Sequence, residues 1–477
     1  MTSWLQYVLI LCAISLVAVF STYRLTESPP LWYDEGYYLQ AAVSVAERGV
    51  QSMQVAPGVY ESTQYVTAGF PLIYPVGASI WIFGDSVGAA RAPMVLFIAL
   101  FCVAAYVLVR RIHNPYVAAW GVLALASFPL LYGNGKSVLG EVPGLLFLMC
   151  ALLSLWLLER SQYREWRYYL LVGVMSGLAL ASKPIFILFV VALMLTWLLR
   201  WRSVPVTLVG VAAAFVGFMS VLAIWILTQF GGDATLSSLV AYYANPYEID
   251  LLQALQSNIV RLVSDVTPLM TLMLVVLWGI GLALRRRSGV SSAELAGFIF
   301  CVLIILAFLR LEGWYRYLFP AAAVALPFAP AALIVLFDRI RFVLPKLLQT
   351  PWIPAVALAV MVIFQYSQLL SGSFVAQYYD SHRVRNLAAL LHAYDSDTSF
   401  FIYNVPEVAI LLPSKNFYQY IDAHARVQIG EEQLEVLRSG GADVTIVDKG
   451  LYEVRPGDFA RYTLARSINN YRILELQ

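Results

Sequence analysis

Residues 27–42 read ESPPLWYDEGYYLQAA, and they come shortly after 23 residues that contain no charged side chain. A helix needs roughly 20 apolar residues to cross the hydrocarbon core of a bilayer, so residues 4–23 are expected to form a first membrane span. A cleaved signal peptide is disfavoured, because the segment lacks a basic start and an obvious cleavage site. Asp34 and Glu35 therefore stand at the exit of the first span.

The composition of the whole chain supports this interpretation. Of 477 residues, 60% are hydrophobic and 13% are charged, and the mean hydropathy is +0.73. Soluble domains carry about twice this charged fraction, so the sequence predicts an integral membrane protein. The four cysteines all lie inside apolar runs, where they are expected to be core thiols rather than a disulfide framework or a metal cluster.

The number of spans depends on residues 168–199, which Lys183 interrupts directly before a proline. Two short helices with a turn at Ser182-Lys183-Pro184 give about eleven spans and place thirteen basic residues in five short cytoplasmic loops, as the positive-inside rule requires. A single helix would move two of these basic loops outside. The eleven expected spans are 4–23, 92–109, 115–135, 142–158, 168–182, 184–199, 203–229, 266–284, 295–309, 317–337 and 351–370.

The fold class that follows is an all-α polytopic membrane bundle over residues 1–370, with a long first extracytoplasmic loop at about 24–91. Residues 371–477 are expected to form a small extracytoplasmic α/β domain. Its part from residue 380 onward holds 23 of the chain's 60 charged residues. Residues 398–404 and 442–449 have strand patterns, and residues 382–394 and 431–440 have helix patterns.

The first loop predicts two helices that lie in the membrane interface. After Glu35, apolar and polar residues alternate with helical period, and residues 71–83 form an apolar stretch too short to span. Two interpretations of the acidic pair stay open. Asp34 caps the first of these helices while Glu35 complements its dipole, or Asp34 is a general base that Glu35 helps to position.

Three motifs of this loop occur together in one known superfamily. The Asp34-Glu35 pair, the segment PLIYP at 71–75 and the segment FGDSVGAAR at 83–91 resemble the GT-C glycosyltransferases. The likeness is to the protein O-mannosyltransferases and to the bacterial transferase that adds aminoarabinose to lipid A. The resemblance implies that Asp34 is the catalytic or acceptor-contacting residue. It also implies a sugar donor linked to polyprenyl phosphate, and inversion at the anomeric carbon.

Two further charges lie in the loop before the fourth span. Lys136 and Glu141 belong to YGNGKSVLGEVPG, and charges near a membrane are functional candidates by default. Glu141 matches a second acidic residue of the resembling families, many of which have Asp there. Binding a metal, contacting the acceptor, pairing with Lys136 and stabilising a helix N-terminus all stay open for Glu141.

Cations in two other outer loops are candidate phosphate ligands. An unpaired Lys183 between apolar helices would be costly to bury, so it needs a phosphate or has to snorkel to the interface. In FLRLEGWYRYLFP, the Arg316-Tyr317 dipeptide matches an "RY-P" segment of the resembling families, which favours Arg316 over Arg310. The alternative is an interfacial aromatic belt anchored by arginine. Lys136, Lys183 and Arg316 are expected to converge on one phosphate or diphosphate, with Tyr317 beside them.

The sequence therefore predicts a membrane glycosyltransferase with its active site on the extracytoplasmic face of the plasma (inner) membrane. Its partners would be a polyprenyl-phosphate-linked sugar, the bilayer and an acceptor protein, lipid or polysaccharide, with no nucleic acid. A divalent cation bound by Asp or Glu stays open, without ligand spacing to support it. The main alternative is a transporter or flippase of a lipid-linked saccharide, which would show paired repeats that this chain lacks. A structural or polymer-ligating membrane protein is a third possibility.

Overall fold

The computed structural model of the chain describes residues 3–63, 66–230, 250–285, 289–343, 345–346, 349–422 and 428–477. The expected cytoplasmic residues Arg286 and Arg287 lie outside this part, as does most of the expected outer loop 230–265.

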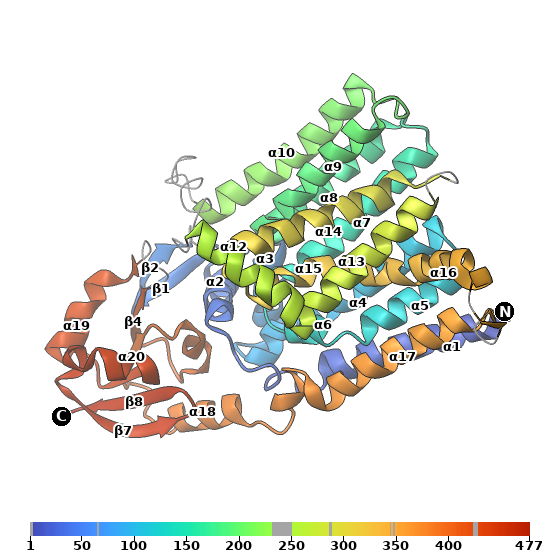
Figure 1. The fold of residues 1–477 in the computed structure, drawn as a ribbon. Coiled ribbons are helices and arrows are strands. Elements are labelled where there is room, and N and C mark those ends of the chain that lie inside the picture. Colours follow the sequence, from blue (N-terminus) through green and yellow to red (C-terminus); the bar gives the residue numbers. More distant parts are fainter. Residues whose placement is uncertain are drawn as a thin grey trace.

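The protein is a bundle of membrane-length helices with a mixed α/β region at one end (Figure 1). Among the described residues, eight helical segments are long and apolar enough to cross a membrane. They are α1 (Ser3–Thr22), α4 (Val87–Ile112), α7 (Glu141–Arg160), α10 (Leu208–Phe230), α13 (Val266–Arg285), α14 (Ser292–Arg310), the continuous segment Phe319–Val343 with α15 (Phe319–Ala325) and α16 (Ala329–Ile340), and the segment that begins with α17 (Ile353–Ser367).

Each of the eleven expected spans falls on helix, although three of these helices are shorter than a full crossing: α5 (Pro115–Ala126), α8 (Trp166–Ser182) and α9 (Ile187–Arg200). The predicted break within residues 168–199 is confirmed. Helix α8 ends at Ser182, Lys183 has extended backbone angles, and Pro184 opens the short 3-10 turn Pro184–Phe186 that leads into α9.

The first loop contains both predicted helices and a hairpin that sequence reasoning missed. Helix α2 (Tyr33–Arg48) is followed by the antiparallel strands β1 (Ser52–Ala56) and β2 (Val59–Ser62), and then by α3 (Phe70–Phe83). The polar face predicted for α2 faces solvent only at its C-terminal end, where Glu47 and Arg48 are exposed. Gln40 and Ser44 are buried, because Gln40 donates to the carbonyl of Pro406 at 2.9 Å and exchanges hydrogen bonds with Gln419.

The C-terminal region is an α/β unit, as the sequence predicts. Its sheet has the order β5-β4-β3-β6-β8-β7, with β4, β3 and β6 parallel and the other pairs antiparallel. The strands are β3 (Phe400–Tyr403), β4 (Phe417–Asp422), β5 (Gln428–Ile429), β6 (Val444–Asp448), β7 (Tyr462–Ile468) and β8 (Tyr471–Leu476). The helices are α18 (Arg383–Leu391), α19 (Leu434–Ser439) and α20 (Lys449–Val454).

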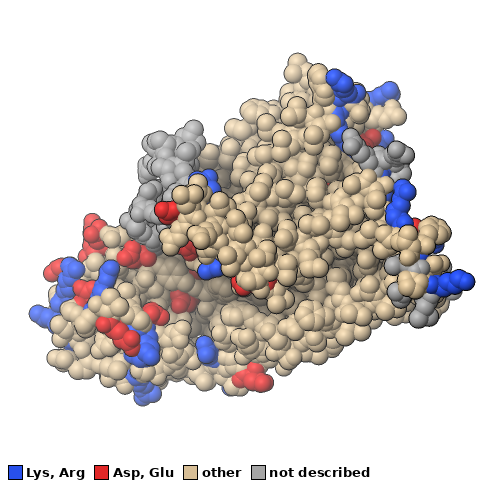
Figure 2. Space-filling model, in the orientation of Figure 1, with Lys and Arg blue, Asp and Glu red and all other residues tan. Residues whose placement is uncertain are grey.

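This C-terminal unit docks on the first loop and not on the far end of the bundle (Figure 1). Glu27 accepts hydrogen bonds from the backbone N–H groups of Val384 and Arg385 at 3.1 and 2.9 Å, and so caps the start of α18. Figure 2 shows Lys and Arg gathered at the opposite end of the bundle, near the N-terminus, whereas acidic residues are common around the C-terminal unit.

Candidate active site

The first turn of α2 distributes three consecutive residues to three different surroundings. Trp32, two residues after Pro30, has extended backbone angles and is the N-cap, so the helix begins at Tyr33. Successive residues then point about 100° apart around the helix axis. Asp34, Glu35 and Gly36 consequently meet different parts of the molecule. Asp34 is the second residue of the helix and not its cap.

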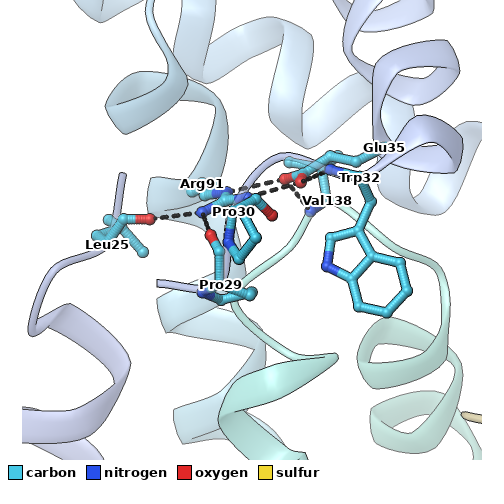
Figure 3. Close-up of polar contacts among 7 residues, drawn as sticks. All are labelled: Leu25, Pro29, Pro30, Trp32, Glu35, Arg91 and Val138. Carbon is cyan, nitrogen blue, oxygen red and sulfur yellow. Dashed lines mark hydrogen bonds and ion pairs between the residues drawn. The ribbon is translucent and has the colours of Figure 1, made fainter. Parts of the chain in front are cut away.

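Glu35 points into the bundle, where it forms a sealed ion pair with Arg91 of α4 (Figure 3). Its two carboxylate oxygens accept from Arg91 Nε at 2.8 Å and Nη2 at 2.6 Å, and both side chains are fully buried. The backbone N–H of Val138 donates to the same carboxylate at 2.9 Å. Arg91 also donates to the carbonyls of Leu25 and Pro29, each at 2.8 Å. This network fixes the entry to α2 relative to α4 and the loop before α7.

Asp34 points the other way and meets Arg316. Its Oδ2 accepts from Arg316 Nη1 at 2.5 Å, with 32% of the Asp34 side chain and 11% of the Arg316 side chain exposed. Arg316 belongs to the short 3-10 turn Tyr315–Tyr317 between α14 and α15. Its guanidinium lies over the rings of Trp314 and Tyr317, which stack on each other. The Nε of Arg316 is buried and has no hydrogen-bond partner among the described residues.

A groove of about 1050 Å³ opens beside this pair. Asp34 and Arg316 line it together with Arg261 and Asp265, while most of the remaining lining is apolar or aromatic. Helix α17, the residues that follow it and the turn around Phe128 supply much of this apolar wall. The groove is thus lined by a few charged side chains and by a larger number of apolar and aromatic ones.

A second ion pair stands near the first. Lys183 Nζ lies 3.6 Å from Glu141 Oε1 and 3.0 Å from the hydroxyl of Tyr38. Electrostatic interactions link Lys183 to Asp34 and Arg316, so these four charges and Tyr38 form one cluster. Glu141 Oε2 is buried and has no hydrogen-bond partner among the described residues.

The structure does not bring Lys136 into this cluster. Lys136 is fully buried beside the Glu35–Arg91 network and donates to the carbonyl of Tyr23 at 3.0 Å. Burial, with the nearby positive charge of Arg91, lowers the pKa of Lys136 to about 7. Of the three cations expected to converge on a phosphate, Lys183 and Arg316 lie in one cluster and Lys136 lies apart.

The donor set does not suit a divalent ion. Asp34 faces Arg316 and Glu141 faces Lys183, so each carboxylate has a cationic partner. Within the part of the chain that the structure describes, no three His, Cys, Asp or Glu side chains are grouped to hold a metal. No step below depends on a metal.

Sequence reasoning missed three residues of this region. Tyr38 follows Asp34 by one helical turn, so the spacing could have placed it on the same face. Arg91 was part of a recognised motif, but its partnership with Glu35 joins residues 56 positions apart. Arg261 lies within the expected outer loop 230–265 and carries no local signal for its place in the groove.

Comparison with known proteins bears on the fold. Residues 72–225 match the family model described as dolichyl-phosphate-mannose-protein mannosyltransferase. No curated protein sequence matches the chain significantly.

Among solved structures, ArnT from Cupriavidus metallidurans bound to undecaprenyl phosphate is similar over 99% of this chain and 98% of that chain, with 14% identity and a TM-score of 0.64. The oligosaccharyltransferase AglB from Archaeoglobus fulgidus, in complex with an inhibitory peptide and a dolichol-phosphate, covers 96% of this chain and 71% of its own, with 13% identity and a TM-score of 0.56. The chain therefore has the fold of the GT-C glycosyltransferases, and the resemblance inferred from its first loop is confirmed.

Proposed function

We propose that the protein is a membrane glycosyltransferase that moves a sugar from a polyprenyl-phosphate donor to an acceptor hydroxyl, with Asp34 as general base. The observation that carries the proposal is the Asp34–Arg316 pair in the wall of a groove whose lining is otherwise mostly apolar or aromatic. A lipid-linked sugar has the same division, because its charged phosphate separates a polar sugar from a long hydrocarbon chain.

Arg316 is suited to hold the donor phosphate. A guanidinium carries five N–H donors in a fixed fork, so Arg316 can bind Asp34 and a phosphate oxygen together. Its buried and unpartnered Nε supplies a donor that a phosphate would satisfy. Lys183 adds a second positive charge to the cluster, and Tyr317 supports the guanidinium through its ring.

The reaction follows from these positions. The acceptor oxygen attacks the anomeric carbon, and the bond between that carbon and the phosphate oxygen breaks. The hydroxyl proton passes to Asp34, whose Oδ2 is held by Arg316. The electron pair of the broken bond leaves on polyprenyl phosphate, where Arg316 and Lys183 stabilise the developing charge. Inversion at the anomeric carbon is the outcome that the GT-C resemblance implies.

Glu35 is a positioning residue in this scheme and not a group that touches substrate. It holds the first turn of α2 against α4, which fixes the direction of Asp34. Glu141 holds Lys183.

The distribution of basic residues supports an extracytoplasmic site in the plasma membrane. Arg110, Arg160 and Arg200 lie in the last turns of α4, α7 and α9. Figure 2 shows Lys and Arg gathered at the end of the bundle opposite the C-terminal unit. Under the positive-inside rule that end is cytoplasmic, so Asp34 and the C-terminal unit face outside. The acceptor, whether protein, lipid or polysaccharide, would approach from there.

The test uses purified protein in detergent with a panel of polyprenyl-phosphate sugars. We expect one donor to be cleaved, with release of polyprenyl phosphate and sugar transfer to an added acceptor. Asp34→Asn should lower kcat by about 1000-fold, within the range for loss of a general base. Movement of an intact donor across vesicles without cleavage would instead favour a flippase, and undiminished turnover of Asp34→Asn would overturn the base assignment.

A further inference from the structure

The turn that carries Arg316 is held by an amphipathic helix that lies beside it, α12 (Leu251–Ser264). The inner face of α12 contains Asn258, which is 1% exposed. The side-chain amide nitrogen of Asn258 donates to the carbonyl of Phe308 at 3.0 Å and to that of Leu311 at 2.5 Å. One amide thus ties the last turn of α14 to the start of the loop that leads to Arg316.

Two further residues of this region extend the contact along the same loop. Arg261 donates to the carbonyls of Glu312 and Gly313 at 3.0 and 3.3 Å. Asp265, directly after α12, accepts from the hydroxyl of Tyr315 at 2.5 Å. Every residue from 311 to 313, and then Tyr315, is therefore held from α12 before the chain reaches Arg316.

The fit between Asn258 and the loop is close. Gly313 has a φ of 72°, which favours glycine, and a Cβ at this position would lie 2.0 Å from Asn258 Oδ1. The loop therefore needs both a residue without a side chain and the amide that packs against it.

The other face of α12 is apolar and exposed. Leu252, Ile259 and Val263 are 77%, 48% and 58% exposed, as expected for a helix that lies at a membrane surface. Asn258 does not line the groove, whereas Arg261 does. Asn258 consequently has no direct route to a donor in the groove and acts on the site only through the loop.

We propose that Asn258 is a positioning residue that sets the place of Arg316 and thereby the affinity for the lipid phosphate. The inference rests on the proposed function, since it assigns the phosphate to Arg316. Loss of the amide leaves the carbonyls of Phe308 and Leu311 without this donor, and the turn 311–316 then relaxes away from Asp34.

The test measures binding of a short-chain polyprenyl phosphate, which needs no knowledge of the sugar. Asn258→Ala should raise Kd about ten-fold, and Asn258→Ser, which keeps a hydroxyl donor, about three-fold. Gln256→Ala, an exposed change on the same helix, is the matched control and should bind like wild type. Thermal unfolding in the same detergent shows whether each variant is folded. If Asn258→Ala is not folded, the binding test is made with Asn258→Ser.

A double-mutant cycle identifies the route of the effect. In an Arg316→Ala background, Asn258→Ala should weaken binding less than two-fold, because the residue on which it acts is already gone. A ten-fold loss that persists in that background, or wild-type binding by folded Asn258→Ala, overturns the inference. If wild-type protein itself binds no polyprenyl phosphate, the proposed function fails instead.

Discussion

Two ion pairs begin at neighbouring residues of α2 and differ in almost every physical respect. The Glu35–Arg91 pair is fully buried, and backbone groups of Leu25, Pro29 and Val138 complete its hydrogen bonds. The Asp34–Arg316 pair lies in the wall of a groove, with about a third of the Asp34 side chain exposed, and one buried N–H of Arg316 has no partner among the residues that the structure describes.

The difference shows how one helical turn can serve both folding and chemistry. A buried pair with every atom satisfied resists exchange, because removing one partner strands a charge in a low-dielectric interior. A pair that faces a groove can exchange partners, since a phosphate or an acceptor proton can reach it. Both pairs join a carboxylate to a guanidinium, so the surroundings decide the role.

The largest effect on stability is expected at the sealed pair. Arg91→Met should leave Glu35 buried without its partner and cost about 3–5 kcal/mol in free energy of unfolding. The matched change Arg316→Met should move the thermal midpoint far less while it weakens donor binding. Thermal unfolding of both variants in detergent checks this. Equal loss of stability at the two arginines would remove the distinction between the pairs.

Gly36, the third residue of the same turn, contacts Glu407. The carboxyl group of Glu407 should make the free energy of unfolding depend on pH, by about 3 kcal/mol at most. Gly36 packs against the backbone of Glu407, where a Cβ would lie 2.3 Å from the Glu407 nitrogen. Burial raises the pKa of Glu407 to about 7; Tyr471 donates to its carboxylate, and Asp448 and Glu35 add negative charge nearby. The folded state therefore favours the protonated acid.

The sign of the effect follows from linkage. Because the folded pKa lies above the ordinary value, this stabilisation is complete below pH 4.5 and is lost as the pH rises to about 7. Glu407→Gln should unfold at the same temperature as wild type near pH 5 and at a higher temperature near pH 8. Thermal scans between these pH values, with protease sensitivity of the C-terminal unit, measure it. A Glu407→Gln variant with the wild-type pH dependence would contradict this account.

The smallest predicted effect is at Lys183, the second cation of the cluster that contains Asp34 and Arg316. Lys183→Met should raise KM for the donor about ten-fold, or roughly 1.4 kcal/mol, and change kcat little. The structural reason is that Lys183 already has Glu141 and Tyr38 as partners, so only part of its charge is available to phosphate. Lys449→Met, an exposed lysine of the C-terminal unit, should leave KM unchanged. An unaltered KM in Lys183→Met would remove Lys183 from the donor site.

Local pattern was sufficient to predict much of this fold. Hydropathy and loop charge predicted the bundle and the break at Lys183, and helix and strand patterns located α18, α19, β3 and β6. Strands β7 and β8 were missed because neither shows a regular alternation of buried and exposed residues. Burial of the polar face of α2 was missed because its cover, the C-terminal unit, lies more than 360 residues further along the chain.

For the site, too, the sequence predicted some features and not others. Asp34, Glu141, Lys183 and Arg316 could be selected because charges at membrane boundaries are few. Their pairing could not be predicted, since Asp34 and Arg316 are 282 residues apart. Lys136 shows the limit of selection by charge alone. It lies in the same loop as Glu141, but its side chain is buried beside the Glu35–Arg91 network and outside the cluster.

The most direct measurement compares Asp34→Asn with Glu35→Gln, two isosteric changes at adjacent positions. Each variant is assayed for its rate of sugar transfer and for its thermal midpoint in the same detergent. We predict opposite results for the two variants. Asp34→Asn should keep its thermal midpoint within a few degrees and lose about 1000-fold in transfer rate. Glu35→Gln should mainly lower the thermal midpoint. Full activity in Asp34→Asn, or full stability in Glu35→Gln, would contradict the assignment of these carboxylates.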